Sequence, residues 1–525
     1  VFRDAIDQLR EQGLRDPEAW NLEKCYADPK VKEIIAKGRT KGIFYIESPA
    51  QTRLNKKAQV ETFEELAITS SLVRPAGASY CLQFIDRHRK MKMGVRDWEF
   101  LHPSLEPILS ETHDVCAFQE DVTKICHHVA GLSFKQADKI RKMMNSLHEG
   151  SVEDRLWIET EREFLAGCIK NSGLTVEQAR ELWMRVSSFT GFSFCKSHSA
   201  SYAQLSFKCT YLKAHYPAQF LAAVISNNHG FYSKDAYINE ARRWGIRILP
   251  LDINKSGIKY VGKHNWMRPG IMHVRNLTDK TSSRIVEEKG IREFANVEDF
   301  ISRVGAYRHE VENLVLAGAF DGFGLNQPEL LYVIDGIYGR HRSLAENGLQ
   351  FDVFGTRDRH PNHSDYSLTE KCLNELHILG FMLSGNILDI LDLHPKSKGT
   401  VPAGEIANFV GKGIKVFGWP VTERVHTVST TGKTMMFLTL EDQTGSMDVI
   451  FWPRNYGRFA DVLAKPGPYE VWGKVTEEWD THCLEAVNIR SAEWSPSQID
   501  FELASQRLTR SAGYVYTDLP GIVAA

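Results

Sequence analysis

The stretch that decides the fold of this chain lies at residues 189–220 and reads FTGFSFCKSHSASYAQLSFKCTYLKAHYPAQF. Small and apolar side chains, among them Ala203, Phe207 and Leu212, recur there at helical spacing. We therefore predict a helix after the turn that opens the stretch. Ser199 is expected to cap this helix, because a serine hydroxyl accepts a hydrogen bond from an unpaired amide of the first turn.

Two interpretations fit the residues that open this helix. Lys196, Ser197, His198 and Ser199 would bring a cation to the positive end of a helix dipole, beside amides that are free to bind a phosphate. The same four residues would equally suit an ordinary cap followed by a histidine in the core. The residues alone favour neither interpretation.

The whole block resembles the fingers of the bacterial DNA polymerase III alpha subunits, the C-family DNA polymerases. Members of that family carry a similar run, Gly-Phe-x-Phe-x-Lys-Ser-His-Ala/Ser-Ala-x-Tyr-Ala, followed by Tyr-Leu-Lys-Ala-His-Tyr-Pro-Ala-x-Phe. A match over so long a block is far more specific than a short motif, and the chain is identified as a member of this family. The resemblance implies a multi-domain α+β protein with largely helical fingers, a helix-hairpin-helix region and a C-terminal OB-fold β-barrel.

The composition is that of an ordinary globular protein. Of the 525 residues, 42% are hydrophobic and 25% are charged, and the formal net charge is only −2, so a surface for nucleic acid must be a local patch. The nine cysteines show neither a Cys-x-x-Cys pair nor zinc spacing, which indicates reduced thiols. With no long apolar run and no signal-peptide pattern, we expect a cytoplasmic protein without a membrane partner.

A second resemblance concerns the incoming nucleotide. Residues 137–144, Ala-Asp-Lys-Ile-Arg-Lys-Met-Met, resemble the family's Ala-Asp-x-Leu-Arg-Arg-Ala-Met, whose basic pair faces the triphosphate. Arg141 keeps the guanidinium fork that suits phosphate oxygens, and Lys142 replaces the second fork by a point charge. The Gly-Lys-Lys that usually follows is absent. The resemblance implies that a dNTP is bound by Arg141, Lys142, Lys196, His198 and Ser199.

Residues 1–255 are expected to form the palm edge and the fingers. Residues 43–49 predict a strand that Pro49 stops, and residues 102–190 predict mainly helices. One of these helices begins at residues 118–122, Phe-Gln-Glu-Asp-Val, which resemble the family's Tyr-Gln-Glu-Asp/Gln-Val block.

Contacts with DNA are expected from two basic segments of the same region. Arg74 lies in a segment that resembles the family's Leu/Ile-Arg-Pro-Gly-Pro, although Ala76-Gly77-Ala78 replaces its last residues. Residues 87–92 form a basic cluster that could meet a phosphate backbone without sequence preference, through Arg87, Arg89 and Lys90. A solvated charged face is the alternative for this cluster.

Residues 256–345 resemble the family's tandem helix-hairpin-helix region. Helices are predicted at 280–289 and from 300 to 320, and residues 317–321, Ala-Gly-Ala-Phe-Asp, match a family segment. Such hairpins bind DNA by aiming the backbone amides of a Gly-rich turn at a phosphate. The first turn, residues 275–278, reads Arg-Asn-Leu-Thr in place of Gly-x-Gly. A purely structural role of this hairpin therefore fits the sequence at least as well as DNA binding does.

Residues 346–412 are predicted to be a linker and a connector. Within them QFDVF, residues 350–354, resembles the family's clamp-binding Gln-x-x-Leu/Met-Phe, so binding to the sliding clamp is expected from Gln350, Val353 and Phe354. A chance match of five residues is the alternative. Two histidines nearby are not expected to bind a metal, because a linker offers no ordered shell around the ligands.

Residues 413–492 change to short segments that predict strands, at 414–419, 435–440, 447–452 and 469–475. Their order resembles an OB-fold barrel. Aromatic side chains among them would stack on single-stranded bases, and we expect DNA contacts from Trp452 and Lys433. Burial in the barrel core is the alternative for several of these aromatic residues. Residues 493–525 are predicted to be a mostly unstructured tail.

The function implied is that of the C-terminal portion of a DNA-directed DNA polymerase, a nucleotidyltransferase of DNA replication or of translesion synthesis and DNA repair. Family members hold two Mg²⁺ ions with palm aspartates, and no Asp-x-Asp occurs in this chain. We therefore expect Mg²⁺ to be held by a palm region that precedes residue 1, with no catalytic residue in this chain, which would be inactive alone.

The expected partners are template-primer and single-stranded DNA, dNTP, the sliding clamp, and other replisome or translesion subunits. Residues 230–233, Gly-Phe-Tyr-Ser, resemble the error-prone branch of the family more than the replicative branch. A non-catalytic accessory protein that binds DNA and the clamp is the alternative function.

Overall fold

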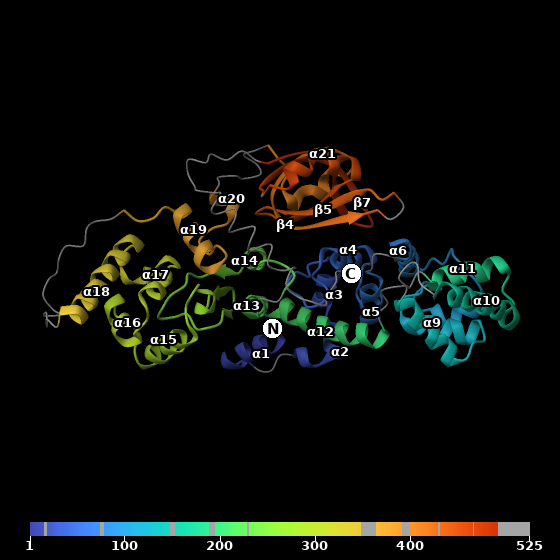
Figure 1. Ribbon diagram of the computed structural model, residues 1–525, viewed down its shortest axis with the longest axis horizontal. Coiled ribbons are helices and arrows are strands. Elements are labelled where there is room, and N and C mark those ends of the chain that lie inside the picture. The colour runs from blue at the N-terminus through green and yellow to red at the C-terminus, as the bar shows by residue number, and fades with distance from the viewer. Residues whose placement is uncertain are drawn as a thin grey trace. The chain divides into compact units, whose positions relative to one another are not determined.

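The computed structural model describes residues 1–14, 18–73, 78–146, 153–187, 195–227, 230–347, 364–390, 399–428, 431–465 and 467–491. The chain separates into two compact units (Figure 1). Among the described residues, the helical unit comprises Glu18–Ala214 with Trp479–Thr481, and the mixed unit comprises 1–14, His215–Glu478 and 482–491. Each unit is described separately.

Helices make up the regular structure of the helical unit, and the described residues between Glu18 and Ala214 contain no strand. A π-helical turn, Ile125–Val129, continues the helix α8. The α-helices are α2 (Leu22–Ala27), α3 (Pro29–Ala36), α4 (Pro49–Ala58), α5 (Phe63–Leu72), α6 (Ala78–Lys92), α7 (Glu106–Leu109), α8 (Gln119–Lys124), α9 (Phe134–Ser146), α10 (Glu153–Ser172), α11 (Val176–Ser187) and α12 (Lys196–His215).

The strand predicted at residues 43–49 is wrong. The chain forms turns there instead, because Tyr45 adopts a left-handed φ of 70° and the Ile43 amide bonds back to the Thr40 carbonyl. Pro49 does not stop a strand but opens α4, where its missing amide costs nothing. The Ser48 hydroxyl caps that helix by accepting from the Gln51 amide.

Helix α12 confirms the helix predicted from the opening stretch, but the predicted cap is wrong. The helix already begins at Lys196, so Ser199 lies inside its first turn and is fully buried, with its hydroxyl 2.7 Å from that of Ser71 in α5. Near the other end, the buried Lys213 ammonium donates to the carbonyls of Arg39 and Lys41 at 2.8 and 2.7 Å. Polar contacts therefore fix α12 near both ends.

A buried carboxylate joins α6, α11 and the segment that precedes α8. Asp114 is 1% exposed, and its Oδ2 lies 2.8 Å from Arg185 Nη1 in α11 and 3.3 Å from Arg87 Nη1 in α6. The guanidinium of Arg87 also packs over the Trp98 ring at 4.6 Å. Around this group an apolar core packs α7–α11, with Leu109, Val122, Ile125, Phe164 and Leu182 among its buried members.

The mixed unit begins with helices packed on a small sheet. Helix α13 packs against α1 and against β2, and the sheet order is β1-β3-β2. A Cβ at Gly262 would come within 2.1 Å of the Ala218 carbonyl oxygen, so only glycine allows this close approach of β2 to α13. The elements are α1 (Phe2–Glu11), α13 (Pro217–Asn227), α14 (Lys234–Arg243), β1 (Arg247–Ile248), β2 (Val261–Lys263) and β3 (Trp266–Arg268).

The predicted helix-hairpin-helix region contains α15 (Asp279–Ile291), α16 (Val297–Val304), α17 (Arg308–Leu316) and α18 (Gln327–Asn347), which pack on one another (Figure 1). The helix predicted from 300 to 320 is two helices, because Gly305 takes a left-handed φ of 64° and ends α16. In the first turn Asn276 adopts a φ of 56°, a conformation that asparagine tolerates better than most residues. Asn276 thus takes the left-handed position for which a glycine is expected.

A closed barrel of five strands, in the order β4-β5-β6-β8-β7, confirms the predicted OB-fold. The four predicted strands are present, and β8 and α21 were not predicted. Helix α21 follows Trp452 directly, and Pro453 is its first residue. The remaining elements are α19 (Leu368–Leu379), α20 (Ile387–Ile390), β4 (Gly413–Thr427), β5 (Thr434–Glu441), β6 (Ser446–Phe451), α21 (Pro453–Leu463), β7 (Tyr469–Glu478) and β8 (Thr481–Ser491).

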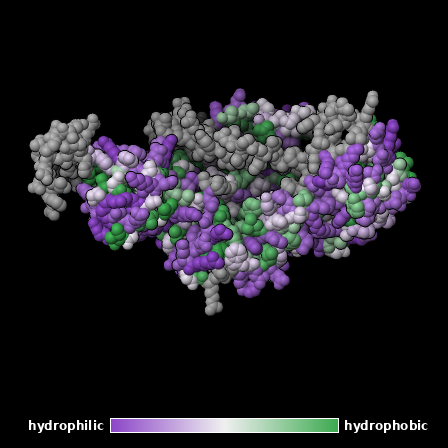
Figure 2. Space-filling model, turned by 60° about the horizontal axis from the view of Figure 1, so that its bottom comes forward, coloured by the Kyte–Doolittle hydropathy of each residue, from purple (hydrophilic) through white to green (hydrophobic). Residues whose placement is uncertain are grey.

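Hydrophilic side chains cover most of the described surface on the face shown in Figure 2, and hydrophobic ones lie between them in scattered patches. Among the helices that the structure describes, none is long and apolar enough to cross a membrane.

Replacing Asp114 by asparagine should destabilise the helical unit by roughly 3–5 kcal/mol, because Arg87 and Arg185 would lose the buried carboxylate between them and Arg185 would keep only the exposed Glu181. Urea unfolding followed by tryptophan fluorescence measures the loss. The matched control is Glu106→Gln, whose carboxylate pairs with Arg96 at the surface, and it should cost less than about 1 kcal/mol. Equal unfolding curves for the two variants would contradict the structural role given to Asp114.

Candidate functional site

The candidate site is built around the first turn of α12, which carries the Lys-Ser-His-Ser sequence. The backbone amide of Lys196 donates to Glu120 Oε2 at 2.9 Å, so a carboxylate from the α8 segment already occupies one free amide of this helix end. The Cys195 carbonyl accepts from the amides of His198 and Ser199 at 3.1 and 3.3 Å. The helix therefore begins at Lys196, and its first amide faces α8.

The ammonium group of Lys196 has two neighbours. Its Nζ lies 5.5 Å above the centre of the Phe118 ring and forms an ion pair with Glu111. The Phe118 ring is buried, and the lysine side chain is 46% exposed. Lys196 thus rests on an aromatic face, which attracts cations, while remaining open to solvent.

Arg141 approaches the same segment from α9, and Lys142 follows it on that helix. Arg141 Nη1 donates to Gln119 Oε1 at 3.0 Å, and its Nη2 donates to Asp138 Oδ1 at 2.8 Å. Lys142 Nζ lies 2.8 Å from the other oxygen of Asp138. Arg141 therefore contacts Gln119, and Lys196 contacts the neighbouring Phe118. The structure thus brings two cations that lie 55 positions apart in the sequence to one short segment.

The start of α8 holds this arrangement in place. The buried carboxylate of Asp121 accepts from the amides of Ala117 and Phe118 at 3.0 and 2.9 Å. Burial raises the pKa of Asp121 to about 6, against the two amide hydrogen bonds that lower it. The hydrogen bonds fix the backbone of Phe118, on whose ring Lys196 rests.

His198 and Ser199 point to other neighbours. The His198 ring packs on Tyr202 at 4.1 Å, and the Tyr202 ring contacts Phe44 and Tyr45. Ser199 is buried against Ser71. The structure therefore brings Lys196 and Arg141 toward one segment, and it directs His198 and Ser199 toward the turn at 39–48 and α5.

The basic cluster on α6 is largely engaged with its own unit. Arg87 pairs with the buried Asp114, and its side chain is 12% exposed, so its contact with DNA stays a prediction. The Arg89 guanidinium donates to the Lys57 carbonyl at 3.0 Å, and Lys90 lies 2.9 Å from both Asp86 and Asp97. Ion pairs and hydrogen bonds with neighbouring residues thus engage most of the cations of this cluster.

On the barrel, strand alternation separates core from surface. Phe417 and Phe451 are fully buried, as the core interpretation predicts. Phe437 is half-buried on the opposite face of β5, paired with Arg424 of β4 and Ile450 of β6. Trp452 is 44% exposed at the start of α21.

Lys433 is exposed beside β5, and its backbone carbonyl accepts from the Val428 amide. The remaining predicted site residues, Arg74, Gln350, Val353 and Phe354, lie outside the described residues.

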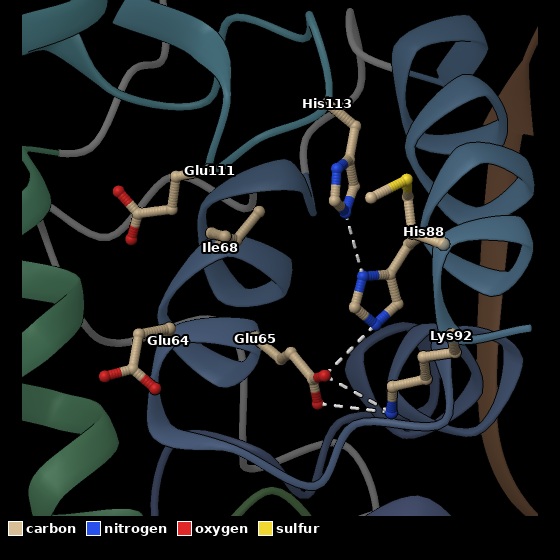
Figure 3. Close-up of a pocket in the computed structure, with 8 residues that line it drawn as sticks. Glu64, Glu65, Ile68, His88, Lys92, Glu111 and His113 are labelled. Carbon is tan, nitrogen blue, oxygen red and sulfur yellow. Dashed lines mark hydrogen bonds and ion pairs between the residues drawn. The ribbon is translucent and has the colours of Figure 1, made fainter. Parts of the chain in front are cut away.

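A cavity of about 270 Å³ lies between α5, α6 and the segment at 111–113 (Figure 3). Its polar groups form a chain in which His88 lies 3.3 Å from Glu65 and 3.1 Å from the His113 ring. The residues that line it are Glu64, Glu65, Ile68, His88, Met91, Lys92, Glu111 and His113.

The charges in this cavity do not suit a phosphate. Burial, together with the nearby charges of His88 and Arg87, lowers the pKa of His113 to about 4, so this imidazole is neutral at pH 7. Contacts with His88, the Glu61 amide and Lys92 outweigh the opposing effect of burial and lower the pKa of Glu65 to about 2. Three glutamates thus face a single lysine, and the candidate phosphate site is the α12 turn beside the cavity.

Within the described ranges, no group of three or more His, Cys, Asp or Glu residues is arranged to hold a metal ion. The described residues therefore do not fit the two-metal site of a polymerase palm, and no step below passes through a metal bound by this chain.

The sequence did not point to Glu111 as a residue of the site. Glu111 lies 85 positions before Lys196 and in no recognisable motif, so only the fold brings the two together. Phe118, Gln119 and Glu120 lie in a block that resembles the family, so the sequence offered a reason to include these three residues in the site.

Comparisons with known proteins give three domain matches. Residues 1–172 match the bacterial DNA polymerase III alpha subunit finger domain. Residues 245–330 match a helix-hairpin-helix motif, and residues 420–486 match an OB-fold nucleic acid binding domain.

Similar curated proteins carry the name DNA polymerase III subunit alpha. The protein from Aquifex aeolicus is 29% identical over 471 residues, which cover 89% of this chain and 39% of the relative. That from Saccharopolyspora erythraea is 28% identical over 535 residues, covering 94% and 43%. That from Staphylococcus aureus strain MRSA252 is 28% identical over 461 residues, covering 86% and 42%. The chain spans about two fifths of the length of these relatives.

The three matched domains follow one another in the order expected from the sequence, and the alignments run over most of this chain. The barrel and the helical unit have the folds that these domains require. The chain is therefore similar over most of its length to bacterial DNA polymerase III alpha subunits, and the matches support a C-terminal portion of such a subunit.

Proposed function

We propose that this chain works in a DNA-directed DNA polymerase and that its helical unit binds the triphosphate of the incoming dNTP. The observation that carries the proposal is the meeting of Lys196 and Arg141 at residues 118–120, beside the N-terminus of α12. A lysine, a guanidinium fork and a positive helix end form a set of donors that suits phosphate oxygens. Lys142, His198 and Ser199 remain proposed contributors, with Ser199 acting from a buried position.

Polymerisation by this chain is proposed to need a palm region supplied in addition to it. The chain spans about two fifths of the length of its relatives. We propose that such a palm region holds the Mg²⁺ ions, which would activate the primer hydroxyl and stabilise the leaving pyrophosphate. The part proposed for this chain is to bind and orient the nucleotide.

The mixed unit is proposed to hold DNA. The left-handed Asn276 in the first hairpin turn supports a backbone contact with a phosphate, and a contact of this kind would not depend on sequence. On the barrel, the outward Phe437 and Trp452 support stacking on single-stranded bases, with Lys433 and Arg424 near the nucleic-acid backbone. In the helical unit, Arg74, Arg89 and Lys90 are proposed as weaker, electrostatic contacts with DNA.

The same proposal includes the sliding clamp and the other replisome or translesion subunits as partners, in the bacterial cytoplasm. It covers both replication and translesion synthesis, because residues 230–233 alone carry the likeness to the error-prone branch.

Replacing Lys196 by alanine should raise the KM for dNTP about tenfold to a hundredfold, since a charge-assisted contact with phosphate is lost. The measurement is primer extension with Mg²⁺ by this chain mixed with a polypeptide that carries the family's palm. Lys208→Ala is the matched control, because it removes the same charge from the same helix, where the lysine lies over Trp20. If Lys196→Ala leaves extension unchanged while DNA binding persists, the chain is an accessory protein without a nucleotide site.

Binding to the sliding clamp should be abolished by the combined change Gln350→Ala and Phe354→Ala, because the proposed motif loses both its polar and its apolar anchor. Surface plasmon resonance with immobilised clamp measures this loss. Asp352→Ala is the control, since it changes a position that the motif leaves open. Undiminished binding by the double variant would remove the motif from the proposal.

Trp452→Leu should weaken the affinity for single-stranded oligonucleotides at least about fivefold, because leucine offers no ring on which a base can stack. Trp452→Phe retains a ring and should lose much less. Fluorescence anisotropy gives the affinities, and thermal unfolding checks that the barrel remains folded in both variants. Equal affinities for the leucine and phenylalanine variants would show that no base stacks on this residue.

A further inference from the structure

The three cations proposed to bind phosphate, and the amide at the start of α12, are each already paired with a carboxylate of the same unit. Lys196 is paired with Glu111, the amide at the start of α12 donates to Glu120, and Asp138 pairs with the two cations of α9. Carboxylate oxygens and phosphate oxygens accept from the same donors. The site as it stands is therefore filled by the protein's own anions.

Glu111 differs from the other two carboxylates in the part of the chain from which it comes. Asp138 lies within one turn of its partners on α9, and Glu120 binds a backbone amide. Glu111 comes from a segment without regular structure, at the edge of the cavity, and Figure 3 shows its carboxylate turned away from the His88–His113 pair. Its side chain is 39% exposed, so it can exchange its partner for water at little cost.

Lys196 does not depend on Glu111 for its position. Its ammonium group also lies over the Phe118 ring at 5.5 Å, and the buried Asp121 holds the backbone beneath that ring. Removing the charge of Glu111 should therefore leave Lys196 in place, with a stronger tendency to bind another anion.

We propose that Glu111 is a built-in competitor for the triphosphate, which neutralises the charge of Lys196 when no nucleotide is bound and so lowers the affinity for nucleotide. This inference rests on the proposed function. On binding, a triphosphate oxygen replaces the Glu111 carboxylate at Lys196, and Glu111 turns to solvent. The repulsion between Glu111 and the bound phosphates then favours release of a nucleotide that is not firmly held by the other contacts.

The test is the variant Glu111→Gln in the primer-extension mixture of this chain and the palm polypeptide. We expect the KM for dNTP to fall about twofold to fivefold with kcat unchanged, because an exposed ion pair of this kind contributes modestly. The gain should shrink as salt concentration rises, since salt screens exposed charges. General damage to the structure would instead raise KM.

Two controls separate a local effect from a change in net charge. Glu106→Gln removes the same charge five positions away, where the carboxylate pairs with Arg96, and should leave KM unchanged. Glu111→Asp keeps the carboxylate and should keep KM close to that of the unmodified chain. In a chain that already carries Lys196→Ala, Glu111→Gln should have no further effect, because the competition needs both partners.

Each outcome decides between the two proposals. If Lys196→Ala raises KM but Glu111→Gln leaves it unchanged or raises it, the competitor role is overturned and the nucleotide site stands. A fall in KM that Glu106→Gln reproduces also overturns the competitor role, because net charge then explains it. If Lys196→Ala has no effect, or the mixture does not extend primers, the proposed function fails and this inference fails with it.

Discussion

The buried carboxylate of Asp114 is the interaction on which the candidate site depends. It is paired with Arg185 of α11 and Arg87 of α6, so it anchors an irregular segment to two helices. Glu111 lies three positions before this anchor and Phe118 four positions after it, and both contact Lys196. The position of the key lysine therefore depends on an ion pair that lies elsewhere in the core and touches none of the predicted nucleotide-binding residues.

The sequence predicted those parts of the molecule that local pattern decides. Helix α12 and the first four barrel strands have clear periodicity, and the structure confirms them. Residues 43–49 were mistaken for a strand because their apolar residues, Ile-Phe-Tyr-Ile, form a short run that Pro49 follows, whereas the left-handed φ of Tyr45 is not visible in composition. The pairing of Arg87 was not predicted because its partner lies 27 positions further along the chain, and Glu111 was missed for the same reason. Long-range pairing of charges is what single-sequence patterns cannot supply.

The near-neutral net charge of −2 is matched in this site, where positive and negative side chains also nearly balance. Cations that are suited to phosphate alternate with carboxylates that neutralise them, so the empty site presents no strong positive patch to solvent. Such a surface would attract nucleic acid weakly and nonspecifically, because nonspecific affinity follows the number of unpaired cations. Selective binding then comes from a ligand that displaces several carboxylates at once, as a triphosphate would, and not from long-range attraction.

The contact of Lys213 with the carbonyls of Arg39 and Lys41 has a mechanical consequence. Helix α12 has 20 residues and is about 30 Å long, and its two ends are tied to different parts of the helical unit. A helix held in this way moves as a rigid body, since a shift of its first turn also displaces its C-terminal end. A displacement at Lys196 would therefore strain the hydrogen bonds between Lys213 and the carbonyls of Arg39 and Lys41, at the opposite end of the helix.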